Sequence, residues 1–147
     1  MWSAVSATGA PSARRDFAWA WAGSRLLVWG GNSGTADLAD GASYDPAADA
    51  WTALSSVRAP SARAYPFACW TGKQLVVWGG LAGSTPLADG AFYEPATDTW
   101  FALDARGSIP AARTGGSFAC AGSSVVLWGG SVGGTYVNTG ARFTPPR

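Results

Sequence analysis

Short apolar runs alternate with glycine-rich and polar turns along the chain, and no segment shows the spacing of an amphipathic helix. Three of these runs are unbroken, and each ends in a tryptophan. They are residues 26–29, 75–78 and 125–128. Unbroken apolar runs of this length are typical of strands that are covered on both faces. A Gly-Gly pair follows each run, where the backbone can turn sharply because no side chain clashes. The pattern predicts an all-β protein.

The apolar runs belong to an internal repeat. Trp29 recurs as Trp78 after 49 residues and as Trp128 after a further 50. An aromatic residue stands 15 positions after each of these tryptophans, and in the first two repeats another tryptophan follows seven positions later. These residues are Tyr44, Tyr93 and Phe143, with Trp51 and Trp100. A proline and an arginine also recur, as Pro11 and Arg14, Pro60 and Arg63, and Pro110 and Arg113.

Each repeat is expected to contain four short strands separated by turn sequences. The expected first strands are 17–22, 66–71 and 117–121, the third strands are 42–45, 91–94 and 141–144, and the fourth strands begin at Trp51 and Trp100. The apolar runs are the second strands. About ten residues between the second and third strands are expected as loops. One of these, residues 129–134, has the glycines of a phosphate loop but no following helix, so we interpret it as a flexible loop.

The order of these features resembles the kelch repeat: a hydrophobic strand, Gly-Gly, a tyrosine and, seven residues later, a tryptophan. The resemblance covers essentially the whole chain and is close in two repeats, whereas the third has Phe143 for tyrosine and ends before its tryptophan. It implies a β-propeller in which each repeat is one four-stranded blade. The expected units are a closing fourth strand at 1–10, blade 1 at 11–59, blade 2 at 60–109 and blade 3 at 110–147, with 1–147 forming one propeller half.

The two ends of the chain suggest how the blades close. Residues 2–5 align with residues 51–54 and therefore resemble a fourth strand, which the third repeat lacks. Three blades would each have to turn the chain by roughly 120°, whereas propellers have about four to eight blades. We therefore expect a six-bladed C2 homodimer in which residues 2–5 of each chain complete the last blade of the other, a closure that removes sheet edges. A fragment cut from a longer propeller agrees with the same features.

Composition excludes several partners. The net charge is +1 and the charged residues are scattered, so no basic stripe offers a surface for nucleic acid. The apolar runs are too short to span a bilayer, and no signal peptide follows Met1, so we expect a soluble chain without a membrane partner. Cys69 and Cys120 fall in neighbouring, non-equivalent columns of the repeat and are expected to be buried, unpaired thiols.

The residue types present exclude several common catalytic arrangements. Histidine is absent, which removes Ser-His-Asp and Cys-His arrangements and most zinc and copper sites. No catalytic residue, metal or cofactor is expected. The acidic residues that recur near turns, among them Asp49 and Asp98, are interpreted as caps of the turn backbone. The recurring tryptophans are expected in the core between blades, and the same is favoured for Trp19, Trp21 and Trp70 over carbohydrate stacking.

Two sets of residues are candidates for binding. Arg14, Arg63 and Arg113 stand where the link from strand four enters strand one, on the face that surrounds the mouth of a propeller channel. They either recognise carboxylate or phosphate groups, with six of them in a ring in the dimer, or bond the carbonyl groups of neighbouring loops and hold the blades together. The second set differs between repeats, as expected for residues that set specificity. It consists of Arg15, Asp16, Tyr65, Asn32, Asp37 and Tyr136.

The hypothesis that follows is a non-catalytic binding propeller that engages a peptide, protein or glycan at the channel mouth. One alternative is a propeller enzyme acting on an acidic sugar through arginine and carboxylates, with Asp16 as its candidate acid. The other is a self-assembling propeller fragment that has no ligand of its own.

Overall fold

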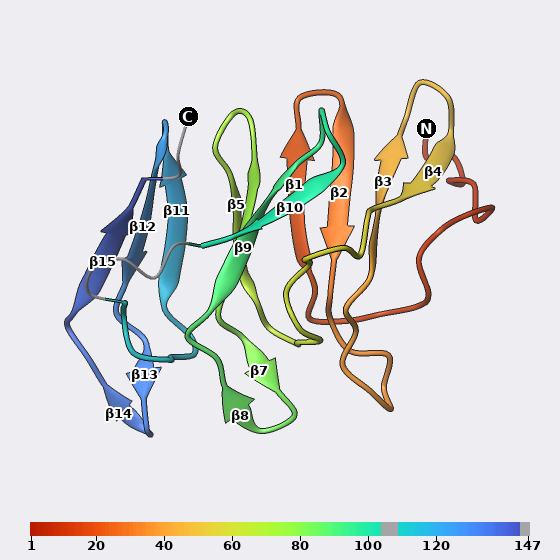
Figure 1. Ribbon diagram of the computed structural model, residues 1–147. Coiled ribbons are helices and arrows are strands. Elements are labelled where there is room, and N and C mark those ends of the chain that lie inside the picture. The colour runs from red at the N-terminus through yellow and green to blue at the C-terminus, as the bar shows by residue number, and fades with distance from the viewer. Residues whose placement is uncertain (104–108, 145–147) are drawn as a thin grey trace.

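Three antiparallel sheets follow one another along the chain in the computed structural model, which describes residues 1–103 and 109–144 (Figure 1). Sheet 1 consists of β1 (Ala18–Ala22), β2 (Arg25–Trp29), β3 (Gly41–Asp45) and β4 (Ala50–Ala53). Sheet 2 consists of β5 (Phe67–Trp70), β6 (Leu75–Trp78), β9 (Gly90–Glu94) and β10 (Thr99–Ala102). Sheet 3 consists of β11 (Ser117–Ala121), β12 (Ser124–Trp128) and β15 (Gly140–Phe143). The predicted strands are therefore confirmed to within about two residues. No helix long and apolar enough to cross a membrane occurs in this part of the chain.

The stretches predicted as loops after the second strands contain additional pairing. In the second repeat they form a separate hairpin of β7 (Leu81–Ala82) and β8 (Thr85–Pro86), and in the third repeat a separate hairpin of β13 (Ser131–Val132) and β14 (Thr135–Tyr136). The first repeat has only the single bridge between Asn32 and Asp37 at this place. The loop interpretation of residues 129–134 was therefore wrong in part, because Gly133 and Gly134 take the positive φ angles of a tight hairpin turn.

The same strand register occurs in all three repeats, and glycine is required to form it. Gly41 pairs with Trp29, and its equivalents Gly90 and Gly140 pair with the equivalent tryptophans. A Cβ atom on Gly41 would lie 2.2 Å from the Val28 carbonyl oxygen, which is far inside any allowed contact. Only glycine lets the third strand approach the second this closely.

The larger part of the core lies between sheets 1 and 2. Trp29 on β2 and Trp100 on β10 are 1% and 0% exposed, and their rings meet edge to face with centroids 5.4 Å apart. Ala18 and Ala20 on β1 are buried beside them, which shows why the first strand is rich in small residues: larger side chains would keep β1 from β5. The edge-to-face geometry adds to the apolar burial at this junction.

Coverage by neighbouring sheets differs along the row. Sheet 2 is covered by a sheet on both sides, since Leu75, Val76 and Val77 are all 0% exposed. Sheet 1 and sheet 3 are each covered by a neighbouring sheet on one side only, and they lie at the two ends of the row (Figure 1). The expectation that the tryptophans lie in the core therefore holds for Trp70, which packs against it, but not in the single chain for Trp19, Trp21 and Trp128. Those three are 62%, 51% and 58% exposed.

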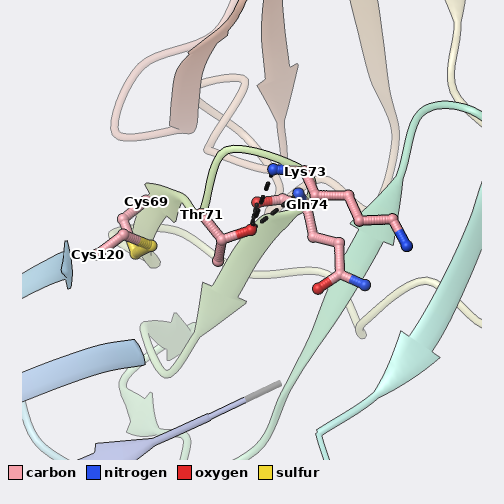
Figure 2. Close-up of a disulfide and its surroundings, with 5 residues drawn as sticks. All are labelled: Cys69, Thr71, Lys73, Gln74 and Cys120. Carbon is pink, nitrogen blue, oxygen red and sulfur yellow. Dashed lines mark hydrogen bonds between the residues drawn. A yellow bond between two sulfur atoms is a disulfide. The ribbon is translucent and has the colours of Figure 1, made fainter. Parts of the chain in front are cut away.

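A disulfide joins sheets 2 and 3. Cys69 on β5 and Cys120 on β11 are bonded, with their Cα atoms 5.5 Å apart (Figure 2). The same view shows the turn after β5, where the Thr71 hydroxyl accepts the N–H groups of Lys73 and Gln74. The prediction of two unpaired thiols was wrong, because the innermost strands of adjacent sheets bring these two neighbouring columns of the repeat into bonding range.

The disulfide closes a loop that spans 51 residues, so it restricts the unfolded chain strongly. We expect the double variant Cys69→Ala/Cys120→Ala to lose roughly 2–4 kcal/mol of unfolding free energy, measured by urea denaturation. Reductant should lower the stability of the unmodified chain by a similar amount and leave the double variant unchanged. Equal stability of the two proteins under oxidising conditions would show that the crosslink contributes nothing.

A recurring set of hydrogen bonds ties sheet 1 and sheet 2 each to the segment that precedes it. In sheet 2, Asp98 Oδ1 accepts the Ser55 N–H (2.8 Å) and the Tyr93 hydroxyl (2.8 Å). The indole N–H of Trp100 donates to the Ser55 carbonyl (2.8 Å). Since Ser55 follows β4 of sheet 1, these bonds join neighbouring sheets. Burial, followed by the bond to Asp98, raises the pKa of Tyr93 well above its usual range.

The N-terminal segment makes the same contacts with sheet 1. Asp49 Oδ1 accepts the Ser6 N–H (2.9 Å) and the Tyr44 hydroxyl (2.6 Å). The indole N–H of Trp51 donates to the Ser6 carbonyl (2.9 Å). The Ser6 N–H, followed by the Tyr44 hydroxyl, lowers the pKa of Asp49. Ser6 thus occupies the place relative to sheet 1 that Ser55 occupies relative to sheet 2, as the sequence alignment of the two segments predicts. Residues 2–5 form no strand in the single chain.

Candidate functional site

The loops that follow the second strands and the links that enter the first strands share one face of the molecule. Each link is held to the loop of its own sheet by a pair of backbone hydrogen bonds. Arg15 and Asn32 exchange bonds of 3.0 and 2.8 Å, and the equivalent bridges join Ala64 to Leu81 and Thr114 to Ser131. A Cβ atom on Gly31 would lie 2.6 Å from the Arg15 carbonyl oxygen, so the second glycine of the Gly-Gly pair is needed for this approach. The candidate binding residues of the sequence all lie on this face or beneath it.

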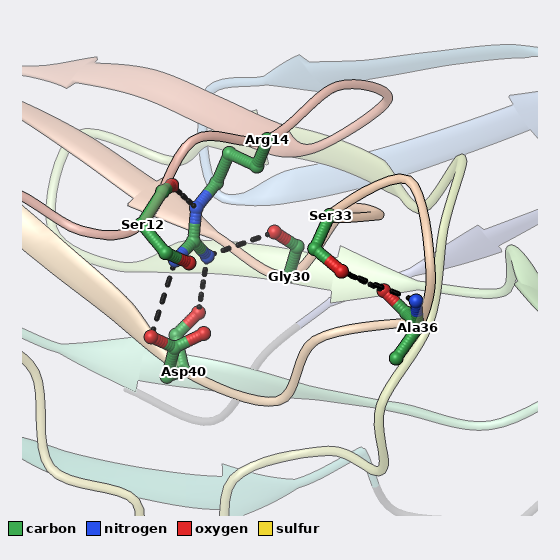
Figure 3. A network of polar contacts seen from close by, with 6 residues as sticks. All are labelled: Ser12, Arg14, Gly30, Ser33, Ala36 and Asp40. Carbon is green, nitrogen blue, oxygen red and sulfur yellow. Dashed lines mark hydrogen bonds and ion pairs between the residues drawn. The ribbon is translucent and has the colours of Figure 1, made fainter.

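The three recurring arginines lie beneath the face, and Figure 3 shows the first of them, Arg14. Arg14 Nη1 donates to the carbonyl oxygens of Gly30 and Asp40, at 3.0 and 3.1 Å. Its Nη2 donates to the Ser12 hydroxyl and to the Asp40 carboxylate, both at 3.1 Å, and Nε donates to the Ser12 carbonyl. A guanidinium group has five N–H donors, so all five are used inside sheet 1 and its links. The side chain of Arg14 is only 4% exposed.

The other two arginines repeat this arrangement. Arg63 makes the same five bonds to the equivalent partners in the second repeat and is completely buried. Arg113 makes the three bonds to backbone carbonyls, since Ala111 and Thr139 stand where the first two repeats have serine and aspartate. These contacts are those of the second alternative raised by the sequence, in which each arginine holds loop carbonyls together.

Replacing Arg63 by lysine tests this role. A lysine ammonium has three donors on a single nitrogen and lacks the planar, forked donor geometry of a guanidinium. It therefore cannot satisfy the carbonyl oxygens of Gly79, Asp89 and Ser61 together. We expect Arg63→Lys to lower the unfolding free energy by about 2 kcal/mol in urea denaturation, because buried acceptors lose their partners. The exposed Arg58→Lys is the matched control and should change stability by less than about 0.5 kcal/mol. An unchanged Arg63→Lys protein would contradict the structural role.

A polar cavity of about 300 Å³ opens on the same face, between the loop of sheet 1 and the link that enters sheet 2. It is lined by Arg15, Asp16, Asn32, Thr35, Ala36, Asp37, Ala64, Tyr65 and Gly83. Five of the candidate residues named from the sequence meet here, all of them from the set that differs between repeats. Thr35 and Gly83 were missed, since neither carries a signal in the sequence that separates it from ordinary turn residues.

Charged groups of both signs lie in the cavity, and hydrogen bonds fix them in place. Arg15 Nη1 and Asp16 Oδ2 form an ion pair at 3.0 Å, with the Arg15 side chain 65% exposed. Asp37 accepts the Asn32 side-chain N–H (2.7 Å) and the backbone N–H of Gly83 (2.6 Å). The Gly83 bond, followed by that from Asn32, lowers the pKa of Asp37, so this carboxylate remains ionised. Because Gly83 lies in the turn of the β7–β8 hairpin of the second repeat, Asp37 also ties the first two repeats together at the cavity.

Two of the lining residues have a backbone conformation that disfavours their side chains. Asp16 and Tyr65 occupy equivalent positions of the repeat with φ angles of 55° and 52°, and the third repeat has Gly115 there with φ 68°. The left-handed region costs a residue with a Cβ roughly 1–2 kcal/mol and is tolerated better by aspartate than by tyrosine. Side chains retained at such positions are a feature of binding and catalytic sites. Both side chains line the cavity.

The one remaining candidate, Tyr136, lies on the same face but outside the cavity. It is on β14, where it is 91% exposed. No group of three or more His, Cys, Asp or Glu side chains suited to a metal ion occurs within residues 1–103 and 109–144.

The repeated sheets, their glycine pairs and their Tyr–Asp–Trp hydrogen bonds agree with a match to a family model. Residues 1–145 match the model of the KLHDC2/KLHL20/DRC7 Kelch-repeats domain. The chain belongs to the kelch-repeat family. A comparison with the curated proteins finds no match. Kelch-repeat domains are generally non-enzymatic modules for protein interaction, which is the class of function that the family assigns to this chain.

Proposed function

We propose that this kelch chain binds a protein partner by taking a short peptide segment into the cavity between sheets 1 and 2. The observation that carries the proposal is the gathering of five polar side chains that differ between repeats around one opening. Residues that recur in a repeat protein serve the repeat, whereas residues that depart from it are free to serve recognition. The buried arginines are of the first kind and the cavity residues are of the second.

The chemistry of the cavity suits a peptide. Arg15 offers donors to a main-chain carbonyl, Asp16 and Asp37 offer acceptors to N–H groups, and the amide of Asn32 has both functions. Tyr65 is 53% exposed and offers an aromatic face beside these groups. A volume of about 300 Å³ is at the lower end for a ligand pocket, which fits one or two side chains of a peptide.

Glycine substitutions separate binding from folding at this site. We expect Asp16→Gly and Tyr65→Gly to keep or raise the unfolding free energy, by up to about 1 kcal/mol, because glycine relieves the left-handed strain. The same variants should lose at least tenfold in affinity for peptides selected from a displayed random library against the unmodified chain, measured by fluorescence polarisation. Tyr136→Gly, outside the cavity, should leave the affinity unchanged.

Three results would contradict the proposal. The first is a failure of selection to yield any peptide with a dissociation constant below about 1 mM, and the second is selected peptides that bind Tyr65→Gly as tightly as the parent. The third is loss of folding in Tyr65→Gly, which would give the tyrosine a structural role.

We also propose that two copies assemble into a closed ring of six sheets, in which residues 2–5 of each copy supply the fourth strand of sheet 3 in the other. The contacts of Ser6 support this, since they are those of a residue that leaves the fourth strand of a preceding sheet. The segment before it has no partner within the described residues: Met1 and Trp2 are fully exposed and Val5 is 54% exposed. Trp100, which is equivalent to Trp2, is 0% exposed in sheet 2.

The solution mass tests the ring. We expect light scattering coupled to size exclusion to give the mass of two chains, near 30 kDa for two chains of 15.0 kDa. Trp2→Ala should weaken the dimer by about 100-fold or more, because truncating a buried tryptophan costs roughly 3–5 kcal/mol. Val57→Ala removes a comparably exposed side chain and should leave the dimer intact. A folded monomer across the concentration range would overturn the ring and leave the peptide proposal standing.

A further inference from the structure

Each end of the row of sheets carries an apolar face that no neighbouring sheet covers, although the equivalent face is covered by a sheet at every internal junction. On the outer face of sheet 1, Leu26 is half-buried and Val28 is buried within the chain. Sheet 3 presents Val126 and Trp128, which are 40% and 58% exposed. Their equivalents in sheet 1 are Leu27 and Trp29, which are each 1% exposed against sheet 2. On its second strand, sheet 3 therefore carries a copy of the face that the second strand of sheet 1 buries.

The outer face of sheet 1 is the counterpart. It carries Leu26 and Val28, whose equivalents Leu75 and Val77 are the residues that sheet 2 buries against sheet 1. A largely apolar groove of about 460 Å³ runs over this face, lined mainly by Phe17, Trp19, Leu26, Val28 and Trp51. Trp51 corresponds to Trp100, which the Trp29 ring contacts at the internal junction.

Strand alternation explains why these faces match. Successive side chains point to opposite sides of a sheet, so each second strand sends two residues toward the preceding sheet and two toward the following one. The side of a sheet that carries Trp29 or its equivalent contacts only the following sheet. The opposite side, which carries Leu75 or its equivalent, contacts only the preceding sheet. One copy of each kind is left open, at opposite ends of the chain (Figure 1).

We propose that the Trp128 face of sheet 3 docks on the outer face of sheet 1 of a second copy, in the register of the internal junctions. The proposal rests on the six-sheet ring and specifies its interface. A second copy is the occupant because it offers both complementary faces at once. A twofold rotation then forms two identical junctions and leaves neither face exposed, which is the condition for a closed assembly.

The disulfide supplies the register of a junction. Cys69 pairs across its sheet with Val76, and Cys120 pairs with Val125. The residue of sheet 3 equivalent to Cys69 is Ala119, which pairs with Val126. The residue of sheet 1 equivalent to Cys120 is Trp21, which pairs with Leu26.

It follows that Ala119 of one copy and Trp21 of the other occupy the positions of the natural disulfide, with a Cα–Cα distance near the observed 5.5 Å. That distance allows a disulfide without movement of the backbone. Within one chain β5 lies between β1, which carries Trp21, and β11, which carries Ala119 (Figure 1). A bond between the two positions therefore joins two molecules.

The test is the double variant Ala119→Cys/Trp21→Cys in the 147-residue chain, oxidised at low protein concentration. We expect a covalent dimer as the main product on a non-reducing gel, with peptide mapping that joins positions 21 and 119. The single variants Ala119→Cys and Trp21→Cys are the controls. They should stay uncrosslinked, because the twofold axis does not bring a position close to its own copy. Crosslinking of the singles as efficient as that of the double variant would indicate random collision and overturn the proposal.

A charge substitution gives a second readout that needs no new cysteine. Trp128→Arg should raise the dissociation constant of the dimer at least 100-fold, as measured by light scattering over a range of concentrations. The variant should stay folded because Trp128 is exposed in the single chain. Tyr136→Arg, on the neighbouring hairpin, should leave the dimer unchanged.

The outcomes separate the proposals. The docking of these faces would be overturned if the unmodified chain is a dimer, the double cysteine variant does not crosslink and Trp128→Arg is still a dimer. Assembly of two chains would then remain supported. A monomeric parent would overturn the docking and the ring, and would assign the faces to other blades or to a different protein. Covalent chains longer than two copies would keep the face pairing and contradict the closed ring. None of these results depends on peptide binding.

Discussion

Burial of one sheet against the next is the constraint on which the structure depends. A four-stranded sheet of this size cannot cover its own apolar faces, and the unbroken apolar run of each second strand makes both faces apolar. Only sheet 2 satisfies this on both sides within the described residues, and there Leu75, Val76 and Val77 are all 0% exposed. Every other feature of the chain either brings sheets together or follows from the faces that remain.

The polar residues that recur serve the same constraint. Asp49 and Asp98 each accept a backbone N–H from the segment that precedes their sheet, and the tryptophan two residues later donates its indole N–H to a carbonyl oxygen of that segment. The buried arginines hold the links to the loops that face them. These groups supply hydrogen-bond partners to backbone N–H and C=O groups where regular strand pairing ends, so the sheets can stack with those backbone groups paired.

Local pattern accounts for what could be predicted from the sequence. The strands and the role of the glycine pairs follow from alternation and turn chemistry, which are read within a few residues. The repeat follows from the spacings of 49 and 50 residues between Trp29, Trp78 and Trp128. The disulfide could not be predicted in this way, since its two columns differ in sequence position and only the approach of β5 to β11 brings them together. The paired strands β7–β8 and β13–β14 were missed because two-residue strands are too short to show any alternation. For the arginines the sequence left two roles open, and only the positions of the carbonyl oxygens distinguish them.

The cavity shows how a repeat protein separates folding from recognition at adjacent positions. Arg14 and Arg15 are neighbours in the chain, yet one uses all five donors inside the fold and the other has a side chain that is 65% exposed at the cavity. Asp16 and Tyr65 show the same difference between folding and recognition, because the third repeat takes the same backbone conformation with Gly115, which has no side chain. A side chain at this position is therefore not needed to form the turn, and it adds strain that the neighbouring sheets must offset. The left-handed position at the entrance of each first strand is thus the place where this fold can change its side chain, and what it binds, without changing its packing.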